Sequence, residues 1–383
     1  MQEPEGDDAR LLINAYCTVA DVPEPAFAHR MKGRRDLRDK ALGPHLNGLM
    51  HHVAEGCQGR MTRLRYHVIR HFQRVQCHVS LSIAPEQLPE FTAWALAANA
   101  IVLAEDGSIR DPQGRVLLFP VQTGDAADDE ASDAEASDAE ADDAGGVADK
   151  VADVAAEGDP LAVMPYLPQA WERKARSEQV LAARKIMVPA DLPPVVTDAE
   201  LRLRTPEEVL RRMLALFVVA IRAESLSGKT PIPVKALRKR FPPAFKGLTE
   251  VERDFLAKDA PDEKEVTLFL WRYEAILVLQ WAIGLQDKLP FADAICDVAA
   301  ISSTVIERGT DGLRQQPVAR PAGEVLDTLD LHYRLHWASR QARLKKTPVP
   351  AGLNDSVLQE RHHALNWLVR FEDREWDEVD TPT

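Results

Sequence analysis

The stretch "TPEEVLRRMLALFVVAIRAES", Thr205 to Ser225, shows most clearly how the C-terminal half of the chain is built. Thr205 is a favoured residue before a helix, Pro206 suits the first turn, and Glu208 stands where a capping box needs an acidic side chain. The apolar run that follows completes the pattern of a well-delimited helix.

Other segments before and after this one have similar signals for the start and end of a helix. "LTEVERDFLAKD" repeats the capping box with Thr249 and Glu252, "DEKEVTLFLWRYEAILVLQWAIG" ends at Gly284, and "NDSVLQERHHALNWLVRFED" opens at Asn354, a favoured cap residue. No convincing strand pattern occurs between them. Residues 161–380 are therefore predicted to form an all-α helical bundle of about seven helices.

The most apolar run of the chain, Val266 to Leu285, is about as long as a membrane span. Arg272 and Glu274 lie inside it, and a bilayer would penalise both charges heavily. The run is expected to be a buried core helix, and no membrane association is expected.

The N-terminal module, residues 9–120, mixes strand and helix patterns. "QCHVSLSI" (76–83) alternates apolar and polar residues with the period of a half-buried strand, and "LLINAYCTVA" (11–20) reads the same way. "AIVLAEDGSIRDPQGRVLLFP" (100–120) predicts two short strands separated by turns, with helices at "GRMTRLRYHVIRHFQRV" (59–75) and "PEQLPEFTAWALAAN" (85–99). An α+β module with antiparallel pairing is expected, so the whole chain is mainly α.

An acidic tract separates the two modules. Residues 121–160 contain fourteen Asp or Glu and one Lys, which accounts for the net charge of −13. Its tandem repeat "ASDAEASDAEADDA" cannot bury enough apolar surface to offset the entropy of ordering, so a disordered linker is predicted. The N-terminus has no apolar signal segment and the four cysteines form no C-x-x-C pair; a cytoplasmic protein with reduced thiols is expected.

Several segments together resemble the domain of unknown function family 4272, a mostly bacterial group. They are "RTPEEVLRRMLALFVVAIRAE", "WRYEAILVLQWAIG", "LPFADAICDV", "LDLHYRLHWASRQAR" and "ERHHALNWL". "YHVIRHFQRVQCHVSLSI" and "WALAANAIVLAEDGSIRDPQGRVLL" look like the N-terminal part of its longer members. The resemblance brings no activity, cofactor or catalytic residue with it.

Charged residues at inward positions of the predicted helices define a candidate polar network or pocket. On a helical wheel Glu360 and Arg361 fall in the apolar arc, whereas His363 falls on the polar side and His362 at the border. A buried charge needs a partner, and Asp327, Asp330 and Arg334 are the candidates. The candidate site comprises Arg272, Tyr273, Glu274, Asp330, His332, Arg334, His336, Glu360 and Arg361. It is interpreted either as a structural network or as a pocket for a ligand or partner.

His332 and His336 share one seam of their helix at a spacing compatible with a metal. With a carboxylate such as Glu360 they suggest an alternative function, a metal-dependent hydrolase. No third ligand is recognisable, so no metal site or cofactor is predicted. "LSGKTP" (226–231) lacks the earlier glycine and the following helix of a phosphate-binding loop.

A basic stripe on the segment 59–75 is the other candidate surface. Arg63, His67, Arg70 and Arg74 share one face, and residues 29–78 contain eleven Lys or Arg against three acids. The face is interpreted as an ordinary solvated surface, a nucleic-acid site, or a face onto which the acidic linker folds back. Nucleic-acid binding is disfavoured because stacking aromatic residues are sparse. The sequence thus favours a non-enzymatic binding or protein-interaction module, with an unidentified protein or small molecule as partner.

Overall fold

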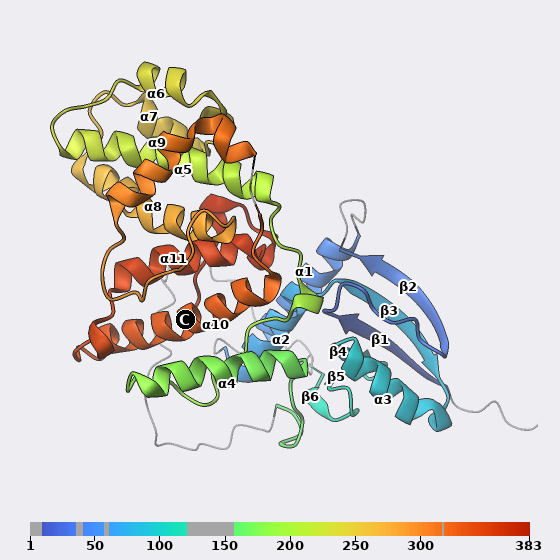
Figure 1. Cartoon of the computed structure of the whole chain (residues 1–383). Helices are drawn as coiled ribbons and strands as arrows, with labels where there is room; N and C mark the ends of the chain where they lie inside the picture. Colours follow the sequence, from blue (N-terminus) through green and yellow to red (C-terminus); the bar gives the residue numbers. More distant parts are fainter. Residues whose placement is uncertain (1–9, 36–40, 57–60, 121–156, 316–317) are drawn as a thin grey trace, which may run out of the picture. The chain divides into compact units, whose positions relative to one another are not determined.

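The computed structural model describes residues 10–35, 41–56, 61–120, 157–315 and 318–383. The chain divides into two compact units, 1–165 and 166–383. In Figure 1 the first unit, blue to cyan, is built from strands and helices, and the second, green to red, from helices. No strand occurs among the described residues of the second unit. The predicted α+β module followed by an all-α bundle is confirmed.

The first unit, hereafter the sheet unit, contains a six-stranded antiparallel sheet. Its order is β2-β3-β1-β4-β5-β6, so β2 and β6 are the edge strands. The strands are β1 (Leu11–Cys17), β2 (Ala28–Arg34), β3 (Cys77–Ile83), β4 (Ala100–Ala104), β5 (Ile109–Arg110) and β6 (Val116–Leu118). The alternating segment 76–83 is the strand β3, as its pattern predicts.

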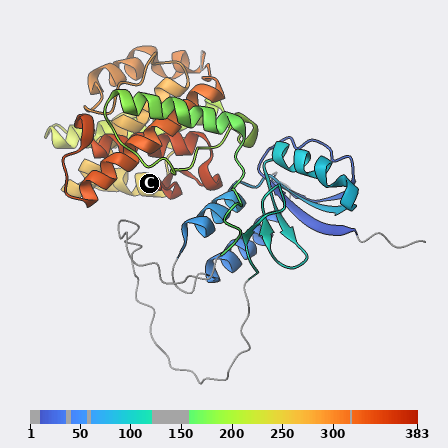
Figure 2. The ribbon, with the colours of Figure 1, turned by 90° about the horizontal axis from the view of Figure 1, so that it is seen from below.

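Helices cover both faces of the sheet. The helices α1 (Leu42–Glu55) and α2 (Arg63–Arg74) lie on one face, and α3 (Leu88–Ala97) on the other (Figures 1 and 2). Side chains of a strand point alternately to the two faces. On one face, Tyr16 of β1 contacts Phe72 of α2 edge to face, with ring centroids 5.2 Å apart. Cys17, the next residue, belongs to the core that packs against α3.

The sequence underestimated the number of strands and helices in this unit. Residues 100–118 form three short strands instead of two, because the D-P-x-G turn is followed by its own pairing segment. The strand β2 and the helix α1 were not predicted, since neither has a regular apolar spacing. Most of the predicted acidic linker lies outside the described residues, but its last part bonds to β6 and to the residue after it: Asp159 N donates to Val116 O at 2.7 Å, and Phe119 N to Glu157 O at 2.8 Å.

The second unit, hereafter the helical unit, has eight α-helices among its described residues. They are α4 (Pro168–Ala183), α5 (Pro206–Ser227), α6 (Val234–Arg240), α7 (Glu250–Ala257), α8 (Glu263–Ala282), α9 (Val298–Arg314), α10 (Ala322–Leu344) and α11 (Asp355–Leu368). The capping boxes form as predicted: Thr205 accepts from Glu208 N, and Thr249 from Glu252 N. Asn354 caps α11 through Val357 N.

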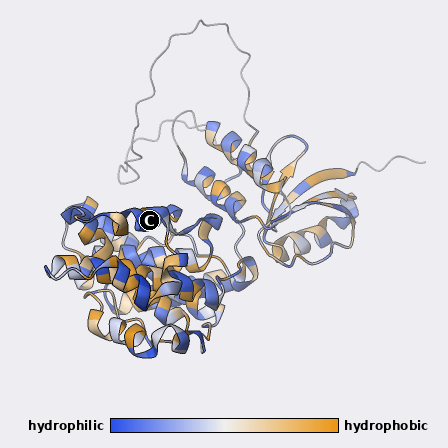
Figure 3. Cartoon of the chain, turned by 90° about the horizontal axis from the view of Figure 1, so that it is seen from above, coloured by the Kyte–Doolittle hydropathy of each residue, from blue (hydrophilic) through white to orange (hydrophobic). Residues whose placement is uncertain are grey.

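Two apolar clusters hold the helical unit together. The larger one joins α5 and α8 with parts of α7, α9, α10 and α11. The smaller one joins α4, α10 and α11. Hydrophilic residues nevertheless recur along these helices (Figure 3), and several of them are buried. The helix α8 is a core helix, as expected, and no helix in the described parts of the chain is long and apolar enough to cross a membrane.

Candidate functional site

Two crossed ion pairs connect α8 to α11. Arg272 Nη1 donates to both carboxylate oxygens of Glu360, at 3.0 and 2.9 Å. Two residues further along α8, Glu274 accepts from Arg361 Nε at 2.9 Å. Arg272 and Glu274 do not pair with each other, and each meets one member of the consecutive Glu360-Arg361 pair. The predicted partners Asp327, Asp330 and Arg334 are wrong, because Glu360 and Arg361 pair with side chains of α8.

The pair Glu274–Arg361 also holds an irregular segment of the chain. The second oxygen of Glu274 accepts from Cys296 N at 2.6 Å, and Arg361 Nη1 donates to Pro290 O at 2.6 Å. Both side chains are at most 2 % exposed. The connection between α8 and α9 has no helical hydrogen bonds of its own here, so the ion pair satisfies backbone groups that burial would otherwise penalise.

Asp330 and Arg334 form a second, separate ion pair within α10. Arg334 Nε donates to Asp330 at 2.8 Å, and both side chains are fully buried. Arg334 Nη2 reaches Pro193 O at 3.1 Å, and Asp330 accepts from Val195 N at 3.4 Å. This pair therefore anchors the connection between α4 and α5.

Side chains of α4 also bind the connection between α4 and α5, and no sequence pattern predicted this. Lys174 donates to Ala190 O and to Leu192 O, the latter at 2.8 Å, and its pKa is lowered by burial. Arg173 donates to Val196 O at 3.0 Å and to Asp327 at 2.9 Å. Nothing in the sequence predicted this role because the anchored segment has no recognisable pattern.

Tyr273 does not belong to the ion pairs beside it. Its hydroxyl donates to Glu224 of α5 at 2.6 Å. Burial is the main reason, and this carboxylate a further one, why the pKa of Tyr273 lies well above its usual value. Tyr273 thus connects α8 to α5, on the side away from α11.

Three histidine rings lie close together between α10 and α11. His336 Nδ1 and His362 Nδ1 are 3.0 Å apart, so one of the two must carry the proton of that hydrogen bond. His332 Nδ1 donates to Thr328 O at 2.8 Å. His362, which the helical wheel placed at the border of the polar side, is only 2 % exposed. The sequence therefore missed the third ring of this cluster.

Burial controls the charge of these rings. Desolvation lowers the pKa of His332 and of His336 to about 4, and it lowers that of His362 well below its usual value, with His336 and His332 adding to the effect. All three rings are therefore neutral at pH 7. The pKa of Glu360 is instead raised, because its desolvation outweighs the attraction of Arg272.

The geometry of the histidine cluster gives the hydrolase alternative no support. Among the described residues, no group of three or more His, Cys, Asp or Glu side chains is arranged to hold a metal ion. Glu360, the carboxylate that the alternative required, is bound on both oxygens by Arg272.

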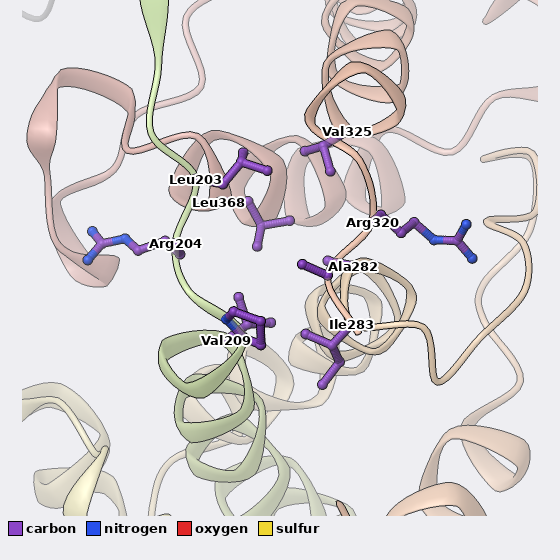
Figure 4. Close-up of a pocket in the computed structure, with 10 residues that line it drawn as sticks. Leu203, Arg204, Val209, Ala282, Ile283, Arg320, Val325 and Leu368 are labelled. Atoms are coloured by element: carbon purple, nitrogen blue, oxygen red, sulfur yellow. The ribbon is translucent and has the colours of Figure 1, made fainter. Parts of the chain in front are cut away.

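A small cleft lies elsewhere in the helical unit, where the start of α5 meets the ends of α8 and α11 (Figure 4). Apolar side chains such as Leu203, Ile283 and Leu368 line it, while the guanidinium groups of Arg204 and Arg320 point away from it. Its empty volume of about 260 Å³ includes space open to solvent. The enclosed part of this space has room for no more than about one water molecule, so the cleft is too small for a cofactor or a drug-sized ligand.

Residues 173–379 match the model of one family, the domain of unknown function DUF4272. The chain belongs to this family. No curated protein and no solved structure matches the chain. The matched range includes the ion pairs and the histidine cluster of the helical unit, so these contacts lie within the family's own domain.

The predicted basic stripe lies on α2 of the sheet unit. Arg63 is exposed, and His67, Arg70 and Arg74 are half-buried. Arg70 donates to Gln73 at 2.7 Å, and Arg74 Nε to Arg70 O at 3.2 Å. The stripe is therefore only partly presented to solvent.

Arg65, which the sequence did not single out, binds a carboxylate. Arg65 Nε and Thr62 Oγ1 donate to the two oxygens of Glu157, at 2.8 and 2.7 Å. Arg65 Nη1 also donates to Val53 O of α1 at 2.9 Å. Glu157 belongs to the end of the predicted acidic linker, so one residue of that segment does lie on the basic helix.

A second basic surface, which the sequence did not predict, is the edge strand β2. Arg30 and Lys32 are exposed, as are His29 and Met31. β2 pairs with β3 on one side only, and a bulge lies between Met31 and Gly33. We call the side chains of His29, Arg30, Met31 and Lys32 the β2 surface.

Proposed function

We propose that this member of the family is a non-enzymatic interaction protein whose sheet unit binds an acidic segment of a protein partner through the β2 surface. The observation that carries the proposal is the exposure of Arg30 and Lys32 on an edge strand. Exposed charges of one sign attract an oppositely charged partner and raise the rate of encounter.

The charged residues of the helical unit support a non-enzymatic role. Two buried ion pairs, Glu274–Arg361 and Asp330–Arg334, have members that are bound to each other and to backbone groups. A catalytic acid or base must be able to reach a substrate. These carboxylates are committed to the fold.

The environment of Glu157 supports the choice of an acidic partner. Arg65 and Thr62 together bind both oxygens of this carboxylate, which is the geometry by which basic surfaces recognise acidic side chains. The contact is intramolecular, and it demonstrates that the charge of this unit can hold a carboxylate in place.

Protection of the sheet edge is the competing structural explanation for the same residues. Charged side chains and bulges on edge strands prevent pairing with other chains. This explanation predicts no affinity for acidic peptides, so a binding measurement separates the two.

The test uses labelled poly-glutamate and the full-length protein. We expect binding that weakens as salt is added, because the attraction is screened over about 8 to 10 Å near physiological ionic strength. Arg30→Glu with Lys32→Glu should reduce the affinity at least several-fold. The matched control is Lys235→Glu with Lys239→Glu, which makes the same change in net charge on exposed residues of α6.

Three outcomes would contradict the proposal. Equal loss of affinity in both double variants would assign the effect to net charge. Loss only in the α6 control would place the site on the helical unit. Tighter binding to duplex DNA than to poly-glutamate, abolished by the β2 substitutions, would favour a nucleic-acid partner instead.

A further inference from the structure

Two cysteines stand directly opposite each other at one end of the sheet. Cys17 is the last residue of β1, Cys77 is the first residue of β3, and they are paired in the register of the two antiparallel strands. On the other side of Cys77, the register pairs it with Arg34, the last residue of β2. Arg34, Cys77 and Cys17 therefore form a row across three neighbouring strands.

The backbone geometry of this row suits a disulfide. Opposite residues of an antiparallel pair have Cα atoms roughly 4.5 to 5.5 Å apart, and their side chains point to the same face. A disulfide spans Cα distances of about 4.4 to 6.8 Å. The two thiols lie close enough to perturb each other's pKa, and the residues are already opposite in the register, so a bond between them requires no shift of the strands.

We infer that Cys17 and Cys77 form a redox modification site, which a hydroperoxide oxidises to a cross-strand disulfide. In the first step the Cys77 sulfur attacks the peroxide: an S–O bond forms, the O–O bond breaks, and one water leaves. In the second step the Cys17 sulfur attacks the resulting sulfenic acid: the S–S bond forms and a second water leaves. Overall, two thiols and one hydrogen peroxide give one disulfide and two waters.

The order of the two steps follows from the surroundings of the sulfurs. The pKa of Cys77 is lowered, chiefly by the hydrogen bond from Cys17 and also by the charge of Arg34, whereas that of Cys17 is raised. The thiolate is the reactive form, so Cys77 attacks first. Both thiols are nearly inaccessible, at 0 % and 2 % exposure, and their position at the strand ends lets fraying admit a small oxidant.

The experiment is peptide mapping of the wild-type protein after treatment with hydrogen peroxide. Free thiols are blocked, the protein is digested with trypsin without reduction, and the products are identified by mass spectrometry. We expect peptide 11–30 linked to peptide 75–110, and the link should disappear after dithiothreitol. Cys296, which is buried in the helical unit, serves as the internal control and should remain a free thiol.

A second test changes the residue beside the thiols and leaves both cysteines in place. Arg34→Gln retains both thiols and should slow formation of the link several-fold, while Arg63→Gln, at an exposed position of α2, should leave its rate unchanged. Recovery of Cys17 and Cys77 as separate blocked thiols after oxidation, or linkage of either one to Cys57 instead, would overturn the inference.

Discussion

Arg361 of the helical unit and Arg30 of the sheet unit both lie on regular elements, and their environments are opposite. Arg361 is fully buried and donates to Glu274 and to Pro290 O. Arg30 is exposed on an edge strand. The comparison extends to their surroundings: Glu274–Arg361 and Asp330–Arg334 are ion pairs buried inside the helical unit, whereas the β2 surface presents its cations to solvent.

The difference indicates two distinct uses of the same residue type. A buried ion pair carries a large desolvation penalty, so its value lies in fixing which groups meet rather than in net attraction. The two fully buried pairs, Glu274–Arg361 and Asp330–Arg334, also bind the backbone of a connecting segment, which a hydrophobic pair cannot do. An exposed cation costs little and contributes little to stability, so it remains available for binding.

The largest effect is expected from Arg361→Ala. The change leaves Glu274 buried and unpaired and removes the donor to Pro290 O, so the free energy of unfolding of the helical unit should fall by about 3 to 5 kcal/mol. Urea unfolding followed by tryptophan fluorescence measures this, since six of the seven tryptophans belong to that unit. Gln359→Ala, an exposed neighbour on α11, is the control.

A second variant determines what the pair contributes. Replacing both partners with apolar residues, Arg361→Met with Glu274→Leu, should recover part of the loss, because no charge is left unpaired. The part of the unfolding free energy that is not recovered measures how much the hydrogen bonds to the connecting segment contribute to stability. A loss below about 0.5 kcal/mol in Arg361→Ala would indicate that the buried network is unimportant.

The sequence predicted the helices of this network better than their contacts. Caps and apolar periodicity are local, so α5, α7 and α11 begin where Thr205, Thr249 and Asn354 predict. The helical wheel correctly placed Glu360 and Arg361 inside. It could not tell which helix lies opposite, because that depends on how the whole bundle packs, and so the partners on α8 were missed.

The β2 surface was missed for a different physical reason. β2 is an edge strand with both faces largely exposed, so its residues have no reason to alternate between apolar and polar. The sequence showed that residues 29–78 carry an excess of basic residues, but the prediction placed the basic surface on α2 alone and left out β2. Arg65 of that helix holds Glu157, Arg63 is the one exposed residue of the predicted stripe, and Arg30 and Lys32 are exposed on β2.

Lowering the pH is expected to have an intermediate effect on the stability of the helical unit. The folded-state pKa of His332 and of His336 is about 4, below the usual value of 6.5. The unfolded chain therefore takes up these protons first, so stability is full above pH 6.5 and falls until about pH 4. The loss should be on the order of 3 kcal/mol for each ring. The raised pKa of Glu360 acts in the opposite direction and reduces the net effect.

The acid prediction is checked with His332→Asn, which retains a polar side chain but does not titrate. Urea midpoints of the wild type and the variant are compared at pH 7 and pH 4.5. The wild type should lose more stability between these two values than the variant does. Identical pH dependence would contradict the burial of a neutral His332 ring.

The smallest effect on stability is expected at the β2 surface. Arg30→Glu and Lys32→Glu should each change the free energy of unfolding of the sheet unit by less than about 0.5 kcal/mol, because exposed substitutions disturb neither packing nor buried hydrogen bonds. Thermal unfolding followed by circular dichroism measures this. These variants also test acidic-peptide binding, so unchanged stability with lost affinity would separate recognition from folding. A loss above about 1 kcal/mol would instead assign the two cations to the structure of the sheet, and the contrast with Arg361 would disappear.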